Sequence, residues 1–357
     1  MKKIFLALAL LTLGLYSSNS SAQLFRLRVS NDGDLSAAEL AILNQALREA
    51  EAEINKDFPS NEDPKRLMQG MANSSVMAGK GIGSDYASRM DVFLIGAGVG
   101  VGADMEKDKE SESDLSGAGV QGGLIIGTNL AWMDTARILG LDTNKLSVYV
   151  NYLGYDLDQK LGDDDKDEIG GKLNSFGIHF RYDWIEGSGS NWFGWGGVKV
   201  HTGYEFNTTK LTFKSTLKED ISEDVGAGQT VSGTINGNPE ATIDVATQSI
   251  PIEISTDVRL LWILSIYTGL GVDFNFGQAK GSGSLNADPT TLNYSGGNDP
   301  TVQAEANIDG TGSVNSVTTR GFAGVQVNLP FLRIFGQVDK AFGSELVGAT
   351  AGVRFVF

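Results

Sequence analysis

The chain has 357 residues and a formal net charge of −16, and it contains 46 Gly, seven Pro and no Cys. Without Cys it cannot be stabilised by disulfides, and its acidic balance excludes nucleic acid as a partner because the two would repel each other. Loss of Lys2 and Lys3 with a leader would leave 26 basic against 44 acidic residues, a net charge of −18.

Residues 1–22 have the features of a signal peptide. Lys2 and Lys3 precede an apolar run from Ile4 to Tyr16, and small residues at Ser20 and Ala22 predict cleavage before Gln23. About 13 apolar residues are fewer than the ~20 that a helical span needs, which disfavours an uncleaved anchor. We therefore expect an exported protein.

Residues 23–90 form a predicted N-terminal helical region. Ser36 and Glu39 make a capping box, and the following apolar residues recur at spacings of three and four, so residues 37–56 predict an amphipathic helix. Its contact stripe consists of Leu40, Leu43, Leu47 and Ile54. A second, weaker helix is predicted between Pro64 and Met77.

From residue 91 onward the apolar residues recur with a period of two. In the segment from Phe176 to Trp184 the large apolar side chains share one face, and the segment from Val198 to Phe206 repeats the pattern. The opposite, inward-facing polar residues are His179, Arg181, Asp183, Lys199, His201 and Glu205. The mature chain has no apolar run long enough for a helical span, so membrane insertion would require strands that close on themselves.

Ten segments carry this pattern, at 91–103, 117–132, 145–156, 172–185, 193–207, 248–259, 263–277, 317–329, 331–341 and 346–357. An even number suits a bacterial single-chain barrel, and a further hairpin within 208–247 would give twelve. The predicted fold class is therefore an all-β transmembrane antiparallel β-barrel of about 10–12 strands over residues 91–357, with an N-terminal α-helical segment. Ten-stranded barrels are usually filled by side chains, so we expect the helices to plug a wider, shared lumen or to pack on the periplasmic side.

The last strand is apolar on its outer face and ends on an aromatic residue, which is typical of the assembly signal of outer-membrane barrels. Its signal residues are Val353, Phe355 and Phe357. They predict insertion by the barrel-assembly machinery into the outer membrane of a Gram-negative-type bacterium. With the carboxy terminus periplasmic, connections near 259–263, 329–331 and 186–192 are periplasmic, and 104–116, 157–171, 208–247 and 278–316 are long and extracellular. All five Trp residues then lie near the periplasmic strand ends.

One predicted strand has a face without side chains, made of Gly96, Gly98, Gly100 and Gly102. This face is suited to close packing, either of the helix or of a neighbouring subunit, and relief of curvature in the wall explains it equally well.

Residues with catalytic or metal-binding chemistry are sparse. Hairpin arithmetic places His179 and His201 nearly opposite each other on the inner face, where a hydrogen-bonded network is favoured over a metal site. No motif supports an enzyme, and no cofactor or metal is predicted. Inward charges of both signs suggest a neutralised interior.

The segment from Leu27 to Ser36, the capped helix, and the segment from Arg66 to Val76 resemble porin-like outer-membrane proteins of the PopA type and the leptospiral surface proteins of the Lsa type. The resemblance implies an oligomeric ring whose subunits form a β-wall around a chamber holding lipid. The expected function is thus a non-catalytic porin-like barrel, a homo-oligomer that encloses or perturbs outer-membrane lipid. The alternatives are a monomeric or trimeric diffusion channel and a surface adhesin that uses the long extracellular segments.

Overall fold

The structure of the chain, a computed structural model, describes the following residues: 25–31, 40, 41, 44, 45, 48, 62–87, 93–107, 113–133, 137, 138, 140–161, 167–190, 192–226, 229–261, 263–287, 290, 291, 293, 294 and 301–357.

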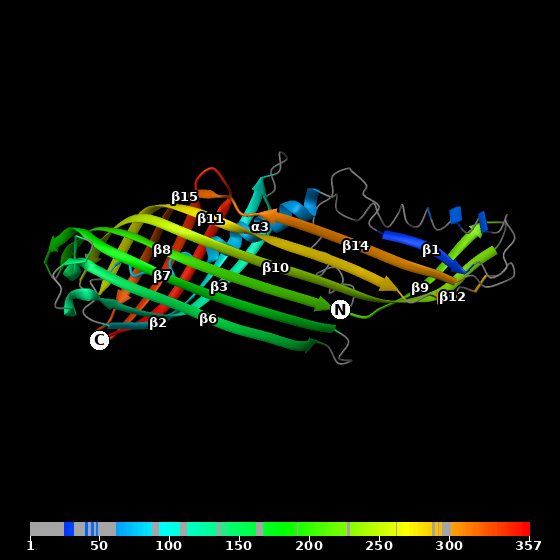
Figure 1. The fold of residues 1–357 in the computed structure, drawn as a ribbon, viewed down its shortest axis with the longest axis horizontal. Coiled ribbons are helices and arrows are strands. Elements are labelled where there is room, and N and C mark those ends of the chain that lie inside the picture. Colours follow the sequence, from blue (N-terminus) through cyan, green and yellow to red (C-terminus); the bar gives the residue numbers. More distant parts are fainter. Residues whose placement is uncertain are drawn as a thin grey trace.

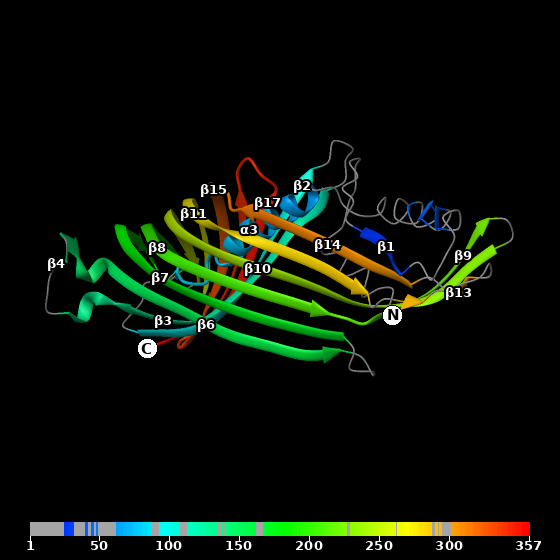
Figure 2. The ribbon, with the colours of Figure 1, turned by 45° about the vertical axis from the view of Figure 1, so that its right-hand side comes forward.

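Ten long strands form a closed antiparallel ring (Figures 1 and 2). In order around the ring they are β2 (Phe93–Lys107), β3 (Ser113–Asn129), β6 (Leu146–Leu161), β7 (Asp167–Gly189), β8 (Phe193–Lys214), β10 (Gln229–Leu260), β11 (Leu264–Ala287), β15 (Val317–Asn328), β16 (Leu332–Ala341) and β17 (Leu346–Val356). The ring closes between β17 and β2, where Val353 is opposite Ala97 and Gly348 is opposite Gly102.

The predicted fold class is confirmed, because each of the ten predicted segments overlaps one strand of the ring. An antiparallel barrel of this kind satisfies all its inter-strand backbone groups internally, which is the condition for a β structure in lipid. The chain therefore has the fold of an outer-membrane β-barrel.

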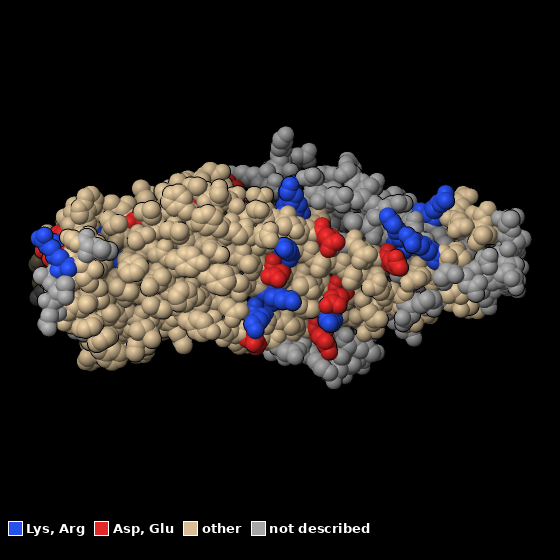
Figure 3. Space-filling view, viewed as in Figure 1, with Lys and Arg blue, Asp and Glu red and all other residues tan. Residues whose placement is uncertain are grey.

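Large apolar side chains cover the outside of the ring and polar ones its inside. Leu124, Ile126 and Val338 are at least 60% exposed, whereas Arg181, Arg320 and Arg354 are buried. Figure 3 shows a broad part of one face almost free of charged residues, with Lys, Arg, Asp and Glu gathered on either side of it. This inverted distribution is that of a barrel whose outer face meets lipid.

One end of the ring, which we call the turn end, carries short connections. These are residues 190–192, residues 261–263 and Leu329–Phe331. The predicted turn at 186–192 is shorter than expected because β7 continues to Gly189. The connection from β3 to β6 is longer and holds η1 (Leu130–Trp132), β4 (Arg137–Ile138), β5 (Leu141–Asp142) and η2 (Thr143–Lys145). The last residue also lies here, since Phe93 N–H donates to Phe357 O at 3.1 Å.

Aromatic side chains are exposed near the turn end. Trp132 and Trp184 are both 59% exposed and Trp192 is 75% exposed, while Trp195 donates from its indole N–H to Thr256. Trp262 lies outside the described residues. These positions suit an interfacial belt, where amphipathic rings meet lipid headgroups.

At the opposite end the wall continues as a sheet extension, which we define as β9, β14, β1, β12, β13 and the parts of β10 and β11 that pair with them (Figure 1). Its added strands are β9 (Leu217–Gly226), β14 (Thr301–Ser313), β1 (Phe25–Asn31), β12 (Thr290–Thr291) and β13 (Asn293–Tyr294). β9 pairs with the start of β10, β14 with the end of β11, and β1 with β14.

The sheet extension corrects two expectations. Residues 278–316 are predicted to be a long extracellular connection between strands, but much of this segment is β11 and β14, because the long edges of β10 and β11 expose backbone groups that further strands satisfy. The extra hairpin expected within 208–247 exists as β9 and β10, but β9 lies outside the ring, which has ten strands and not twelve.

The helix α3 (Glu62–Ala78) lies inside the ring, against β2, β3, β11, β14 and β17. Met68, Ala72 and Ala78 have no exposed surface. The structure places α3 in a lumen, which is one of the two predicted locations, and this lumen is enclosed by the ten ring strands of the same chain. In the first predicted helix, Leu40 is helical and half-buried, and Leu43, Leu47 and Ile54 lie outside the described residues. Within the described chain, no helix is long and apolar enough to cross a membrane.

A charge on the outer face tests which surface meets lipid. Val99 is 53% exposed near the middle of β2, and we expect Val99→Arg to lower the free energy of unfolding in lipid vesicles by ~2–4 kcal/mol. The measurement is a urea titration, with Val99→Leu as the control. Equal stability of the two variants would contradict a lipid-facing position.

Candidate functional site: the plugged lumen

The lumen is occupied by α3 and by the segment 79–87 that follows it, which together we call the plug. The plug runs along the barrel axis from the sheet extension towards the turn end. Pro64 lies beside Gly310 of β14, Ser74 beside Gly119 of β3 and Ala78 beside Gly100 of β2. Two and three residues further on, Lys80 and Gly81 contact the middle of the barrel.

The plug fits because glycines remove side chains from the surrounding wall. A Cβ at Gly100 would overlap the carbonyl of Ala78, and a Cβ at Gly102 would overlap that of Ser74. A Cβ at Gly98 would lie at an ordinary contact distance, 3.5 Å, from the side chain of Ile82, and a Cβ at Gly96 would instead overlap the backbone of β17. The sequence left two explanations open for this glycine face, close packing and relief of curvature. In the structure Gly100 and Gly102 lie against the helix, and Gly96 lies against the neighbouring strand β17.

Other strands contribute glycines to the same seat, and the sequence pattern did not single them out. They are Gly117 and Gly119 of β3, Gly281 of β11, Gly310 and Gly312 of β14, and Gly348 of β17. The clearest sequence signal for them is the alternation of Gly in residues 117–123 and 310–312. A helix can approach a strand this closely only where the strand lacks Cβ atoms.

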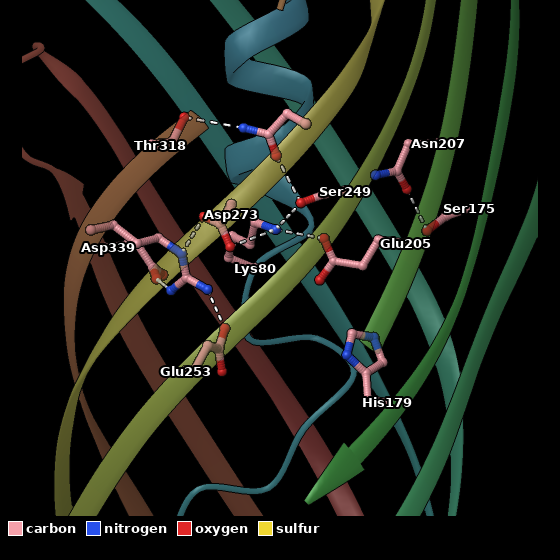
Figure 4. Close-up of polar contacts among 12 residues, drawn as sticks. Lys80, Ser175, His179, Glu205, Asn207, Ser249, Glu253, Asp273, Thr318 and Asp339 are labelled. Carbon is pink, nitrogen blue, oxygen red and sulfur yellow. Dashed lines mark hydrogen bonds and ion pairs between the residues drawn. The ribbon is translucent and has the colours of Figure 1, made fainter. Parts of the chain in front are cut away.

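Below the helix, Lys80 anchors the plug to three strands (Figure 4). Its ammonium lies 2.7 Å from Glu205 of β8 and 3.3 Å from Asp273 of β11, and it donates to Ser249 of β10 at 2.8 Å. Asp273 also accepts from Arg320 of β15 at 2.9 Å. Arg320 pairs further with Asp339, at 2.6 Å, and with Glu253. A buried network of this kind is stable only when every charge has its partner.

Asp85 makes a second anchor nearer the turn end. Its carboxylate lies 3.0 Å from Arg333 and 3.8 Å from Arg354, and Arg181 donates to its backbone carbonyl at 2.8 Å. The neighbouring Tyr86 hydroxyl donates to Glu253 at 2.9 Å. Through Lys80, Asp85 and Tyr86 the plug thus presents a cation, an anion and a phenol hydroxyl to wall residues of complementary charge.

Burial alone would raise the pKa of Asp85, which lies on the plug and not on a spanning strand. The guanidinium groups of Arg354, Arg333 and Arg181 outweigh that effect and lower the pKa from 3.8 to about 2. Asp85 is thus an anion at neutral pH.

The predicted inward-facing polar residues of β7 and β8 lie in the lumen, because alternate residues of a strand point to the same side of the wall. Arg181 pairs with Asp183 at 3.2 Å, Lys199 pairs with Asp257, and Glu205 pairs with Lys80. Together with the ion pairs of Arg320 and Arg354, these pairs fill the lumen with cationic and anionic side chains that neutralise each other.

The two histidines are not opposite each other. His179 faces Gly203 and His201 faces Arg181, because the turn is centred nearer residue 191 than expected, with a register shift between Asp183 and Ile185. His179 instead contacts Asn151 at 3.2 Å and His201 contacts Ser255 at 3.0 Å. Among the described residues, no three His, Cys, Asp or Glu side chains are arranged to hold a metal ion.

The residues of the predicted assembly signal all face outward on or next to β17. Val353 is 40% exposed, Phe355 is 47% exposed and Phe357 is 65% exposed. Lys80, Asp85 and Tyr86 were missed by the sequence analysis because they lie in a short segment without hydrophobic period or motif. The only hint is the row Gly79, Gly81 and Gly83, which allows close contact with the wall.

A closed ring of antiparallel strands with an apolar outside and a filled polar inside defines the class as porin-like outer-membrane β-barrels. Within that class, the chain belongs to the Lsa36-like family, whose model matches residues 22–357. No match is found among curated proteins.

Solved structures with similar strand arrangements include three proteins of low sequence identity. The translocator domain of autotransporter NalP from Neisseria meningitidis is 10% identical, with a TM-score of 0.30, over 75% of this chain and 90% of that one. The P. putida toluene transporter TodX is 9% identical, with a TM-score of 0.25, over 81% and 99%. Ail, the attachment invasion locus protein of Yersinia pestis, is 12% identical, with a TM-score of 0.21, over 75% and 100%.

The glycine seat predicts a strong steric effect at one position. Gly100→Val would push the Ala78 backbone away, and we expect it to destabilise the plugged barrel by ~1–3 kcal/mol and to expose α3 to protease. The control is Gly336→Val, because a Cβ at Gly336 meets nothing within 4 Å. Similar urea midpoints and cleavage rates in both variants would show that α3 does not depend on this seat.

The charge of Asp85 predicts an acid-sensitive plug. Because its pKa falls from 3.8 to about 2 on folding, its stabilising effect is complete above pH 3.8 and is lost as the pH falls through about 2, which amounts to about 2–3 kcal/mol. We expect pepsin to cleave the plug of Asp85→Asn faster than that of the native chain at pH 4, and the two rates to converge near pH 2.

The matched control is Glu345→Gln, which removes the exposed ion pair with Lys340 and should leave cleavage unchanged. A native-to-variant ratio that is constant from pH 4 to pH 2 would exclude Asp85 as the anchor.

Proposed function

We propose that the protein is a non-catalytic barrel of the bacterial outer membrane whose pore is closed by its own plug and whose working part is the sheet extension. The observation that carries the proposal is the filling of the lumen: α3 occupies the extension end, and Lys80, Asp85 and Tyr86 are hydrogen-bonded to the wall below it. With solute passage blocked, the remaining exposed feature is the extended β-sheet.

Three features support the membrane assignment. The outer face is apolar over a broad band, short turns lie at one end, and Phe355 and Phe357 face outward at that same end. Short connections are periplasmic in outer-membrane barrels, so in the proposed orientation the turn end is periplasmic and the sheet extension is extracellular. Outer-membrane lipid is then a partner at the apolar band, and the barrel-assembly machinery a partner during insertion.

A surface role is favoured by the construction of the sheet extension. Charged side chains lie on the ring strands β6, β7, β8 and β10 beside this extension, where the apolar band ends: Lys172 lies 3.6 Å from Asp156, and Lys214 lies 3.6 Å from Glu240. These pairs are at least 47% exposed, so they stabilise little and keep the surface soluble. We propose that this rigid platform presents binding surfaces, as an adhesin requires.

The lipid-enclosing ring implied by the PopA-type resemblance needs several chains around one chamber. The closure of β17 on β2 within a single chain favours a self-contained barrel instead. The mass of the detergent-purified particle separates the two: a monomer without phospholipid supports the self-contained barrel, and a lipid-bearing oligomer overturns it.

A gated channel is the second candidate, and the polar anchoring of the segment 79–87 favours it. Contacts made by Lys80, Asp85 and Tyr86 can be replaced by water, whereas an apolar plug would resist withdrawal. Displacement of the plug would then open the lumen.

Conductance across a planar bilayer tests the closed pore. We expect the native chain to be silent, and the variant Lys80→Ala/Asp85→Asn/Tyr86→Ala to show intermittent conducting steps because its plug has lost its anchors. Glu345→Gln serves as the control and should be silent. Large, steady ohmic steps from the native chain would replace this proposal with a diffusion channel.

A further inference from the structure

The path of the chain relates β1 and β2 in an unexpected way. β1 belongs to the sheet extension, where Phe25 is opposite Ala306 and Val29 is opposite Val302 of β14. β2 begins at the turn end, where Phe93 and Phe357 exchange backbone hydrogen bonds at 3.1 and 3.0 Å. The two strands are therefore anchored at opposite ends of the barrel.

Successive contacts of the plug show how the chain gets from one end to the other. Pro64 lies at Gly310 and Met68 at Gly281, both in the sheet extension. Ser74 and Ala78 lie at Gly102 and Gly100, in the half of the ring next to the sheet extension. Asp85 lies at Arg333 and Arg354, close to the turn end. As the residue number rises, the contacts move steadily along the barrel axis from the sheet extension to the turn end. The plug therefore passes through the lumen once, in one direction.

The pairing of β1 with β14 is specific and not an accidental overlap. Six of the seven residues of β1 are paired, and Arg26 is opposite Glu305 while Arg28 is opposite Gln303. Opposite charges directly across an antiparallel pair stabilise its register. Arg26 and Arg28 are both exposed, which suits the aqueous side of an outer surface.

We infer that the barrel is the conduit for its own N-terminal segment: β1 is displayed on the outer cell surface and is joined to the periplasmic start of β2 through the lumen. This rests on the proposed outer-membrane orientation. The apolar band separates the two ends, and a polar backbone can cross it only inside the ring, where wall and plug satisfy its charges. β1 is thus displayed at the cell surface and does not lie in the periplasm.

Cysteine labelling of the full chain in cells tests this directly, because the native sequence has no Cys. The test position is Arg28→Cys on β1. Lys214→Cys, exposed at the end of β8, is the surface control, and Ser190→Cys, exposed in a turn-end connection, is the periplasmic control. A membrane-impermeant maleimide is applied to intact cells and to cells with a permeabilised outer membrane.

We expect Arg28→Cys to be labelled in intact cells to the same extent as Lys214→Cys, and Ser190→Cys to be labelled only after permeabilisation. If Arg28→Cys instead behaves like Ser190→Cys, the threading inference is overturned while the proposed membrane orientation stands. If the two controls label alike, or in the reverse order, the proposed orientation itself fails.

A second pair of variants checks that the helix is inside the lumen in the same cells. The side chains of Ser75 and Gln121 are hydrogen-bonded at 3.1 Å, so the shorter side chains of Ser75→Cys/Gln121→Cys should be within reach of a short bifunctional thiol reagent, whose crosslink shifts the protein on a gel. Ser75→Cys paired with Ser190→Cys is the control and should form none. Surface labelling at residue 28 without the Ser75–Gln121 crosslink would show that the segment reaches the surface by another route, and would overturn the conduit.

Discussion

The closure of β17 on β2 is the pairing on which the rest of the structure depends. In lipid an open sheet edge leaves N–H and C=O groups without partners, so the first and last strands of the ring must meet. Their meeting fixes ten strands, and ten strands fix the width of the lumen. Everything inside must then fit a space whose size was set by backbone hydrogen bonding.

Two parts of the plug, α3 and the segment 79–87, fill this space, and the wall around each of them is different. Where α3 passes, the wall is lined with Gly residues of β2, β3 and β14, because a helical backbone and wall side chains cannot occupy the same volume. Where the thinner segment 79–87 passes, the wall has room for Arg333, Arg354 and Glu205, and these side chains bind the plug through charge. The plug is thus held by shape at one end and by electrostatics at the other.

The wall could be predicted from the sequence and the plug contacts could not. Phe176, Ile178 and Phe180 alternate with Gly177, His179 and Arg181, and this period alone predicts which side chains face inward. Lys80 and Asp85 lie in a segment without period, so their partners depend on three-dimensional contacts across more than 100 residues. The register of β7 and β8 was missed by two residues because a bulge and the turn position are set locally. The sheet extension could not be predicted, because Gly and Ser in segments such as 281–284 show no alternation of apolar residues.

The length of β10 has a mechanical consequence. A strand of 32 residues is about 105 Å long at ~3.3 Å per residue, whereas a tilted strand needs only ~9–11 residues to span a bilayer. Because the same backbone continues from lipid into the sheet extension, anything bound at its tip is joined to the membrane by a continuous hydrogen-bonded ribbon and not by a flexible loop. In the proposed orientation, this ribbon would hold the far end of β10 at a fixed distance from the lipid.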